Sequence, residues 1–466
     1  MEADLTRSAK TPTAAAGHLH FVGMGGAGMC ALAEVLLRRG RAVSGCDVRD
    51  SGVLQRLRDL GARVWVGHDR DHLEGCAGVI ASRAVSPDTA EIAAAREAGL
   101  PVWHRAQMLA EILAGERLSV GVVGTHGKTT TAALLSAALT GAGHDPTALV
   151  GAEVREFGSH ARVGSGPAVA EVDESDGSLV FVRVHSTILT SLDLTDHADH
   201  YGDVGALLST FRRFLAGLDP GGFALLCADH PNVLRLREAV PCRAMTYGLD
   251  RGEFSARVIE RTGVRSRFAF LAGGRELGEV RLRLPGRHNI TNAVAALAAG
   301  LHIGAGFAPM AQALGCFRGV RRRFDVHCEA PLVVDDYAHN PVKVRSFLRG
   351  LREGWPEARI VAVFQPHRYS RTRTTHAQYA RAFDDADELI VTEIYPADEA
   401  PLPGVSGRLI VDAVAPHRPV RWIPEIEDVP AAILPTLRPG DVVATMGAGD
   451  IWKVAEWIAS GLRSRG

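Results

Sequence analysis

The segment Gly124–Thr131 (GTHGKTTT) carries the residue types and spacing that point most directly to chemistry. It lies between a β-branched run, Ser119–Val123, and a helical pattern rich in alanine and leucine. Glycines at such a turn let backbone N–H groups close around phosphate oxygens, and the helix N-terminus adds positive potential. Lys128 would reach the terminal phosphates of ATP, and the Thr129 hydroxyl would bind Mg²⁺. The predicted ATP-binding residues of this loop are Gly124, Thr125, His126, Gly127, Lys128, Thr129 and Thr130.

A second glycine loop, Gly23–Gly28 (GMGGAG), also follows an apolar run and opens a helical pattern. It matches G-x-G-x-x-G, and Asp47 stands at the end of the next predicted strand, where a carboxylate can hydrogen-bond a ribose. Alone, this fingerprint favours an NAD-dependent oxidoreductase, but the same geometry suits any nucleoside diphosphate because its glycines contact the pyrophosphate. A triphosphate loop and a separate diphosphate loop together indicate that ATP acts on a nucleotide-linked substrate. The residues predicted to bind that substrate are Gly23, Gly25, Gly26, Ala27, Gly28, Met29, Asp47 and Ser82.

Two polar clusters could complete a Mg²⁺ site, since Mg²⁺ prefers hard oxygen ligands. The first cluster, AEVDESD, contains Glu171, Asp173, Glu174 and Asp176. The second cluster, TDHADH, contains Asp196, His197, Asp199 and His200. Any one of these side chains also fits a solvated polar loop. Because both clusters follow predicted strands of the segment that carries Lys128, we expect a metal ligand from each.

Two polar groups further along the chain suit a nucleotide. His288, Asn289 and Asn292 begin a very apolar helical pattern, and helix capping alone would account for only one of the two asparagines. Arg321–Arg323 is a run of three arginines. It is either a solvated linker or the source of a side chain directed at the γ-phosphate.

Two further motifs, DDYAHNP (335–341) and QPHRYSRTR (365–373), follow predicted strands at their carboxyl ends. Open α/β sheets bind ligands at those ends, and histidine, arginine and tyrosine side chains suit an anionic substrate. The candidates are Asp336, Tyr337, His339, His367, Arg368 and Arg371.

The elements that position these motifs alternate between short apolar strands and helical patterns, which is typical of parallel sheets. Between Phe254 and Leu284 the pattern changes to period-two alternation with glycine turns, which predicts antiparallel hairpins. We expect an α/β protein of three domains: a Rossmann-like N-terminal domain, a central P-loop ATPase domain with a mostly parallel sheet plus a small antiparallel sheet, and a Rossmann-like C-terminal domain. The expected boundaries are 1–17 for a flexible extension, then 18–117, 118–320 and 321–466.

Length and composition limit the possible functions. The 466 residues are about three times the usual domain length of roughly 150. The 52 Lys+Arg and 53 Asp+Glu give a formal net charge of −1, so no basic field favours nucleic acid or a membrane surface. The seven cysteines lack C-x-x-C spacing and predict neither a disulfide framework nor a zinc site. No apolar run approaches a membrane span or a signal-peptide core, so we expect a cytoplasmic protein.

In its motifs and their order, the chain resembles the Mur ligase family from about Leu19 to the C-terminus. The resemblance implies a UDP moiety at Gly23–Met29 and ATP at Gly124–Thr131. The other ATP-binding residues that it implies are His288, Asn289, Asn292, Arg323 and Asp336. Those implied for the amino acid or the substrate are Tyr337, His339, His367, Arg368 and Arg371.

The metal ligands implied by the resemblance are Thr129, Glu171 and His197. The family usually has Thr-Asn before its acidic-histidine motif, whereas Ser191 follows Thr190 here and the spacing is one residue longer. This difference leaves His200 as the alternative to His197. Asn340 also stands where a histidine is commoner, which bears on substrate contacts.

The reaction implied by the resemblance joins L-alanine to the carboxylate of UDP-N-acetylmuramic acid in peptidoglycan precursor synthesis. ATP would phosphorylate the carboxylate, the amine would attack the acyl phosphate, and the catalytic residues would be Lys128, Glu171, His197 and Arg323 with Mg²⁺. The string Pro366–Thr372 (PHRYSRT) favours the alanine-adding member, as a monomer or weak homodimer. The alternatives are a related ligase that adds a peptide or another amino acid, an NAD-dependent oxidoreductase, and a P-loop switch or motor.

Overall fold

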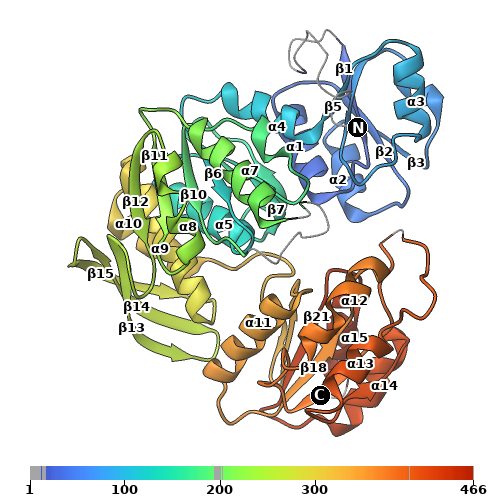
Figure 1. The fold of residues 1–466 in the computed structure, drawn as a ribbon, viewed down its shortest axis with the longest axis vertical. Coiled ribbons are helices and arrows are strands. Elements are labelled where there is room, and N and C mark those ends of the chain that lie inside the picture. Colours follow the sequence, from blue (N-terminus) through green and yellow to red (C-terminus); the bar gives the residue numbers. More distant parts are fainter. Residues whose placement is uncertain (1–11, 13–16, 194–200, 202, 398, 465–466) are drawn as a thin grey trace. The chain divides into compact units, whose positions relative to one another are not determined.

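The computed structural model describes residues 12, 17–193, 201, 203–397 and 399–464 of the chain. Their strands form three sheets, one in each of the predicted domains (Figure 1). By their contacts these residues divide into two compact units, the first with the five-stranded sheet and most of the ten-stranded sheet, the second with the six-stranded sheet. The predicted three-domain α/β architecture is confirmed. Among the described helices, none combines the length and the hydropathy that a bilayer span requires.

The five-stranded sheet has the order β3-β2-β1-β4-β5, and all neighbouring strands pair in parallel. The chain leaves β1 for β2 on one side and later enters β4 on the other, so the strand order reverses beside β1. Open parallel sheets bind ligands at the carboxyl ends of the strands around such a reversal. The elements are β1 His18–Val22, α1 Ala27–Arg38, β2 Val43–Asp47, α2 Gly52–Asp59, β3 Arg63–Val66, η2 Arg70–Leu73, β4 Cys76–Ala81, α3 Ala90–Glu97, β5 Val102–His104 and α4 Arg105–Ala114.

The ten-stranded sheet has the order β15-β14-β13-β12-β11-β10-β6-β9-β7-β8. Its strands from β7 to β12 in this order pair in parallel, and β8 runs antiparallel to β7 at the edge. The period-two segments form β13, β14 and β15, which continue this sheet through the pairing of Tyr247 with Phe254.

The strands of this sheet are β6 Ser119–Val123, β7 Thr147–Val154, β8 Ser159–Arg162, β9 Ala168–Glu171, β10 Ser186–Leu189, β11 Phe223–Cys227, β12 Arg243–Tyr247, β13 Phe254–Thr262, β14 Arg265–Ala272 and β15 Arg275–Leu282. The helices around it are α5 Lys128–Gly141, η3 Ser178–Phe181, α7 Val204–Ala216, α8 Pro231–Leu234, η4 Arg237–Ala239, α9 Arg287–Ile303 and α10 Phe307–Cys316.

The six-stranded sheet has the order β16-β17-β21-β18-β19-β20, with only the β16–β17 pair antiparallel among the described strands. Its strands are β16 Asp325–Glu329, β17 Leu332–Asp336, β18 Ile360–Phe364, β19 Glu388–Val391, β20 Arg421–Trp422 and β21 Val442–Met446. Its helices are α11 Pro341–Gly354, α12 Tyr369–Thr375, η5 His376–Tyr379, α13 Arg408–Val414, η6 Ile426–Asp428, α14 Val429–Ile433, η7 Leu434–Thr436 and α15 Trp452–Arg463.

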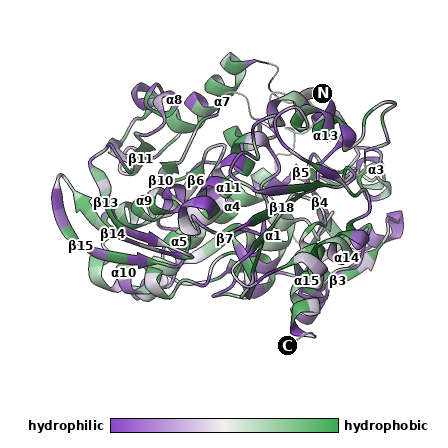
Figure 2. Ribbon diagram, turned by 90° about the horizontal axis from the view of Figure 1, so that it is seen from below, coloured by the Kyte–Doolittle hydropathy of each residue, from purple (hydrophilic) through white to green (hydrophobic). Residues whose placement is uncertain are grey.

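The central strands of each sheet supply the core, and Figure 2 shows apolar residues along β4 and β18. Every residue of β6, β18 and β21 is buried, which is the pattern of parallel strands covered on both faces. Helix α1 is buried on most of its surface because it packs against β7 and β8 as well as against its own sheet. Glu34 on this helix hydrogen-bonds with Ser159 of β8. The cores of the first two predicted domains are therefore continuous.

Candidate nucleotide-binding and active site

The predicted ATP loop folds against the end of β10. Gly124 has a φ of +125°, and a Cβ on it would lie 2.5 Å from Thr190 Oγ1, so only glycine fits there. The His126 N–H donates to the Ser191 hydroxyl (2.8 Å), and the Thr190 hydroxyl donates to the Val123 carbonyl (3.0 Å). The Thr-Ser pair that departs from the family's usual Thr-Asn thus holds the backbone of the loop.

Lys128 is the first residue of α5, where the N–H groups of the helix end give positive potential. Its ammonium donates to the Gly124 carbonyl (2.7 Å) and lies 2.8 Å from Glu174 Oε2. Burial lowers the pKa of Lys128, but the carboxylates of Glu174, Asp173 and Glu171 outweigh that effect and leave this pKa raised. The ammonium is therefore charged at neutral pH at the place where phosphates would bind.

Thr129 and Glu171 form the oxygen-rich part of the site. Thr129 Oγ1 donates to Glu171 Oε1 (3.0 Å), and the Gly151 N–H donates to Glu171 Oε2 (2.7 Å). A hydroxyl and a carboxylate are the hard donors that Mg²⁺ prefers, so both residues fit the predicted metal site. They meet because Glu171 ends β9, which pairs with β6, the strand before the loop. His197 and His200, the two candidates for a further ligand, lie outside the described residues.

Among the predicted adenine contacts, Asn292 lies against the ATP loop. Its Oδ1 would be 2.8 Å from a Cβ on Gly127, whose φ of +83° also favours glycine. Asn289 instead donates through Nδ2 to the Pro285 carbonyl (2.7 Å) at the start of α9. His288 is exposed at the same helix start. The structure thus brings Asn292 to the loop and uses the Asn289 side chain within its own helix turn.

The diphosphate loop is supported by the end of β2. The Gly23 and Met24 N–H groups both donate to the Cys46 carbonyl (2.9 Å each), and the Gly25 N–H donates to Asp47 Oδ2 (2.9 Å). Asp47, predicted to contact a ribose, therefore holds the loop itself through one carboxylate oxygen in this structure.

The first turn of α1 follows this loop, with Gly26 as its N-cap. N–H groups at such a helix start have no partner within the helix and attract anions. The side chain of Met29 is buried in the core, so only its backbone can serve a ligand. Ser82 follows β4, and its carbonyl accepts from the N–H of Val85, whose side chain lies against Gly23. Ser82 is thus part of a turn beside the loop.

Arg105, the first residue of α4, connects the surroundings of both loops, and the sequence reasoning missed it. Its guanidinium donates to Asp173 Oδ2 (2.7 Å) and Asp176 Oδ2 (3.3 Å) in the acidic cluster after β9. The same group lies 3.3 Å from the position of a Cβ on Gly28 at the start of α1. This arrangement puts a fixed guanidinium beside the loop that is predicted to bind the diphosphate. A lone arginine gives no such signal in a sequence, because its carboxylate partner is 68 residues away.

In the second unit, Arg322 and Arg323 have different surroundings. Arg322 has a φ of +60°, and its guanidinium donates to Asp335 Oδ2 (3.3 Å) and to the Gly449 carbonyl (2.8 Å). The Arg323 guanidinium lies 4.8 Å from the centre of the Tyr337 ring. Arg322 is therefore fixed within the fold, and Arg323 remains the candidate for a phosphate contact.

Asp336 ends β17 and holds the segment around Arg323. Its Oδ2 accepts from the Phe324 N–H and its Oδ1 from the Ala338 N–H, both at 2.9 Å. Burial raises the pKa of Asp336, and the nearby Arg323 offsets this only in part. Asp336, predicted to bind ATP, thus positions backbone in this structure.

The residues predicted to contact the amino acid or the substrate gather after β17 and β18. The rings of His339 and His367 lie 6.1 Å apart, and His339 Nδ1 is 2.8 Å from the Tyr337 carbonyl oxygen. Burial, assisted by Arg371 and Arg368, lowers the pKa of His367 to about 3. The imidazole is therefore neutral at physiological pH.

Tyr395 supports this group, and the sequence reasoning missed it. Its ring stacks on His367 at 5.8 Å between centres, and its carbonyl accepts from the Arg368 N–H (2.9 Å). Arg368 has a φ of +68°, a strained conformation for a residue with a side chain. The hydrogen bond to Tyr395 helps to hold it.

A P-loop with its lysine, a separate diphosphate loop in the same unit, and a third α/β sheet edged by histidines and arginines define a multidomain enzyme that uses ATP on a nucleotide-linked ligand. Three family models match the chain: "Mur ligase family, catalytic domain" at residues 18–117, "Mur ligase middle domain" at 122–300, and "Mur ligase, glutamate ligase domain" at 322–449. The chain belongs to the Mur ligase family.

Individual relatives match nearly the whole chain. A UDP-N-acetylmuramate–L-alanine ligase of Desulfotalea psychrophila is 42% identical over 95% of this chain and 97% of that protein. One of Halorhodospira halophila is 43% identical over 96% and 94%. The crystal structure of the UDP-N-acetylmuramate–alanine ligase of Thermotoga maritima has a TM-score of 0.83 at 28% identity, covering 97% of this chain and all of that one. A murein peptide ligase of Psychrobacter arcticus shares the fold, with a TM-score of 0.71 at 22% identity over 96% and 99%.

Proposed function

We propose that this Mur ligase joins L-alanine to the carboxylate of UDP-N-acetylmuramate and converts ATP to ADP and phosphate. The observation that carries the proposal is the identity of 40–43%, over at least 94% of the chain, to relatives that bear the name of this activity. The arrangement of Lys128, Thr129 and Glu171 supports the dependence on ATP. We also propose a cytoplasmic location and a monomer or weak homodimer, which sedimentation velocity of the purified chain tests.

The phosphates of ATP would bind at Lys128 and the N-terminus of α5. In the structure the ammonium already has an anionic partner, since it lies 2.8 Å from Glu174 Oε2. An arriving phosphate therefore competes with a buried carboxylate for the same ammonium. Thr129 and Glu171 would hold Mg²⁺, which neutralises phosphate charge when it is bound.

The proposed reaction needs no nucleophile from the protein. A carboxylate oxygen of the muramyl group attacks the γ-phosphorus, the bond to the bridging oxygen breaks, and ADP leaves. The alanine nitrogen then attacks the acyl carbon, loses a proton, and expels inorganic phosphate. What the chain supplies is positioning and positive charge, from Lys128 at one loop and from Arg105 and the start of α1 at the other.

Phosphate release from ATP tests the proposal. The purified chain is supplied with Mg²⁺, UDP-N-acetylmuramate and one amino acid at a time, and the product is identified by mass spectrometry. We expect release with L-alanine and a product heavier by one alanine residue. Activity only with a preformed peptide would favour the peptide-adding relatives, and release without any acceptor would favour a switch or motor. Nicotinamide cofactor binding without ligation would favour an oxidoreductase.

A further inference from the structure

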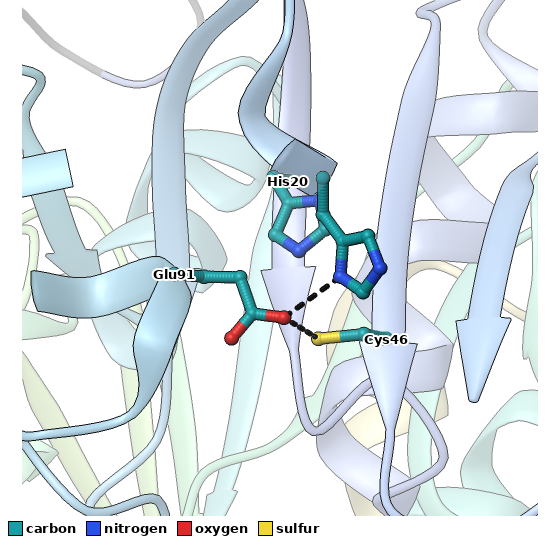
Figure 3. Close-up of side chains that lie close together, drawn as sticks. His20, Cys46 and Glu91 are labelled. Carbon is teal, nitrogen blue, oxygen red and sulfur yellow. Dashed lines mark hydrogen bonds and ion pairs between the residues drawn. The ribbon is translucent and has the colours of Figure 1, made fainter. Parts of the chain in front are cut away.

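Four potential metal ligands meet inside the domain that carries the five-stranded sheet. Their nitrogen, sulfur and oxygen atoms all lie within 4.8 Å of one another, and three of the four residues are buried. Figure 3 shows His20, Cys46 and Glu91 pointing toward one another. They come from β1, β2 and α3, and the fourth residue, His72, comes from η2. Neither loop of the proposed ligase reaction includes any of these side chains.

His20 offers a nitrogen that needs a partner. The residue is fully buried, and its Nδ1 lies 2.9 Å from the Ser44 hydroxyl. Its Nε2 has no hydrogen-bond partner among the described residues. A buried polar atom without a partner is costly, so such an atom suggests a ligand.

Of the other three side chains, two lie on one carboxylate oxygen of the third, Glu91. The Cys46 thiol donates to Glu91 Oε1 (3.0 Å), and His72 Nδ1 lies 2.9 Å from the same oxygen. His68 Nδ1 lies 3.0 Å from the second oxygen, Oε2, and so can orient the carboxylate. The Trp65 ring stacks on the His72 ring with 4.5 Å between their centres. The Cys46 sulfur and the His72 nitrogen thus each lie within 3.0 Å of the Glu91 oxygen, close enough for the three atoms to become ligands of one cation after small side-chain movements.

We propose that His20, Cys46, His72 and Glu91 bind one Zn²⁺ ion in a closed, structural site. Two imidazoles, a thiolate and a carboxylate suit a borderline-soft ion of four-fold coordination. The thiolate and the carboxylate balance the two charges of the ion, which a buried site requires. Binding releases the Cys46 proton to solvent, and all four positions are filled by protein.

The spacing of the ligands is compatible with this ion. Tetrahedral zinc bonds of roughly 2.0–2.3 Å put ligand atoms about 3.3–3.8 Å apart. The widest separation between ligand atoms here is no more than 4.8 Å. Side-chain rotations that move these atoms by about 1 Å would bring them to the zinc spacing. Sequence spacing excluded a zinc site because the cysteines form no C-x-x-C pair. The structure assembles one cysteine with three distant residues instead.

The ion would fix the support of the diphosphate loop. The Cys46 carbonyl accepts the Gly23 and Met24 N–H groups, and the next residue, Asp47, accepts the Gly25 N–H. An ion that fixes the Cys46 side chain therefore also fixes the Cys46 carbonyl, which holds the diphosphate loop through two hydrogen bonds. The inference is independent of the substrate of the ligase, and it predicts that metal loading raises the thermal stability of the chain.

Cobalt substitution tests the site directly. The full chain is treated with a chelator, dialysed, and loaded with Zn²⁺ or with Co²⁺, whose bond to a thiolate gives a charge-transfer absorption band. We expect one equivalent of Zn²⁺ by mass spectrometry, a rise in the unfolding temperature, and the thiolate band with Co²⁺. Binding of Co²⁺ at Thr129 and Glu171 gives no such band, because that site has no sulfur.

Two variants complete the test. Cys46→Ser should abolish the thiolate band, whereas Cys76→Ser, which changes a buried thiol of β4 outside the cluster, should retain it. His72→Gln, at a partly exposed position, should weaken Zn²⁺ binding at least tenfold in competition with a chromophoric chelator. No thiolate band in the unmodified chain, or an equal band in Cys46→Ser, would overturn the proposal. Unchanged Zn²⁺ affinity in His72→Gln would remove that residue from the ligand set and would also overturn it.

Discussion

The guanidinium of Arg105 lies 2.7 Å from the carboxylate of Asp173, and this ion pair joins the helix after β5 to the acidic cluster after β9. It also brings a positive charge next to Gly28 of the diphosphate loop. Arg105→Ala would leave Asp173 and Asp176 without this partner, so we expect the free energy of unfolding to fall by about 1–3 kcal/mol, between the values for exposed and for buried pairs. Affinity for the UDP-sugar should fall as well, which calorimetry measures.

The control for this variant is an ion pair in the same domain that is exposed at both ends. Arg70 lies 2.7 Å from Glu97, and about two thirds of each side chain is exposed (65% and 66%). Arg70→Ala should leave both unfolding and UDP-sugar binding as in the parent. If Arg105→Ala behaves like this control, the partly buried Arg105–Asp173 pair has no role in either property.

Gly124→Ala should weaken nucleotide binding at least tenfold. The new Cβ would lie 2.5 Å from Thr190 Oγ1 at a φ of +125°, so the loop must leave its place on β10. We expect affinity for a fluorescent ATP analogue to fall tenfold or more, which corresponds to about 1.4 kcal/mol. Gly115→Ala, at an ordinary φ of −77° and with its nearest contact at 3.5 Å, should bind the analogue normally.

Lys128→Ala should abolish ligation and leave UDP-sugar binding intact, because the lysine belongs to the ATP loop. The change also leaves the fully buried Glu174 carboxylate without its ammonium partner, so the free energy of unfolding should fall too. The double variant Lys128→Ala/Glu174→Gln separates the two effects. Removing the unpaired charge should restore most of the stability and none of the turnover, as thermal unfolding and phosphate release would show. Equal loss of UDP-sugar binding and of turnover in Lys128→Ala would contradict two separate sites.

Glu171→Gln should raise the Mg²⁺ concentration required for half-maximal activity. The amide keeps the shape of the side chain but removes the negative charge that accompanies the Thr129 hydroxyl. We expect an increase of at least about tenfold. Glu276→Gln, on the exposed face of β15, is the control and should need no more Mg²⁺ than the parent. A Mg²⁺ titration that superimposes for Glu171→Gln and the parent would exclude this residue as a ligand.

His367 should make the protein less stable in mild acid. The native pKa is about 3 because of burial and Arg371, whereas the unfolded residue titrates near 6.5. Between these values the unfolded state binds the extra proton, so stability falls as the pH drops from about 6.5 toward 3. His367→Gln should lose less stability over this range in thermal unfolding. Above pH 7 both proteins carry a neutral side chain at position 367, so the difference in their unfolding temperatures there gives the effect of packing alone. Curves of unfolding temperature against pH that stay parallel down to acid pH would contradict the lowered pKa of His367.

The sequence was sufficient for features whose chemistry is local. Both glycine loops, Lys128, Thr129 and the succession of three α/β sheets follow from short motifs and hydrophobic periodicity. The residues alone left Glu171 as one of four acidic candidates, and the family resemblance singled it out. Its position beside Thr129 follows from the pairing of β9 with β6, which the sequence does not show. The ligase activity came from the family resemblance and not from periodicity.

Features that depend on contacts between distant segments could not be predicted. Asp47 looks like a ribose ligand in the sequence, and its hydrogen bond to Gly25 appears only when β2 lies beside β1. The sequence does not distinguish Arg322 from Arg323, and only the fold shows that Arg322 donates to the Gly449 carbonyl. The pairing of Tyr247 with Phe254 likewise joins the hairpins to the central sheet.

Helix α1 begins at the diphosphate loop and packs on β7 and β8 of the sheet that carries the ATP loop. This helix therefore connects the two predicted nucleotide sites. We therefore expect the folded chain to hold the two predicted sites at one separation before either ligand binds. An inhibitor that links a UDP mimic to an ATP mimic would need a linker of one particular length, and shorter or longer linkers would lose the gain from joining the two ends.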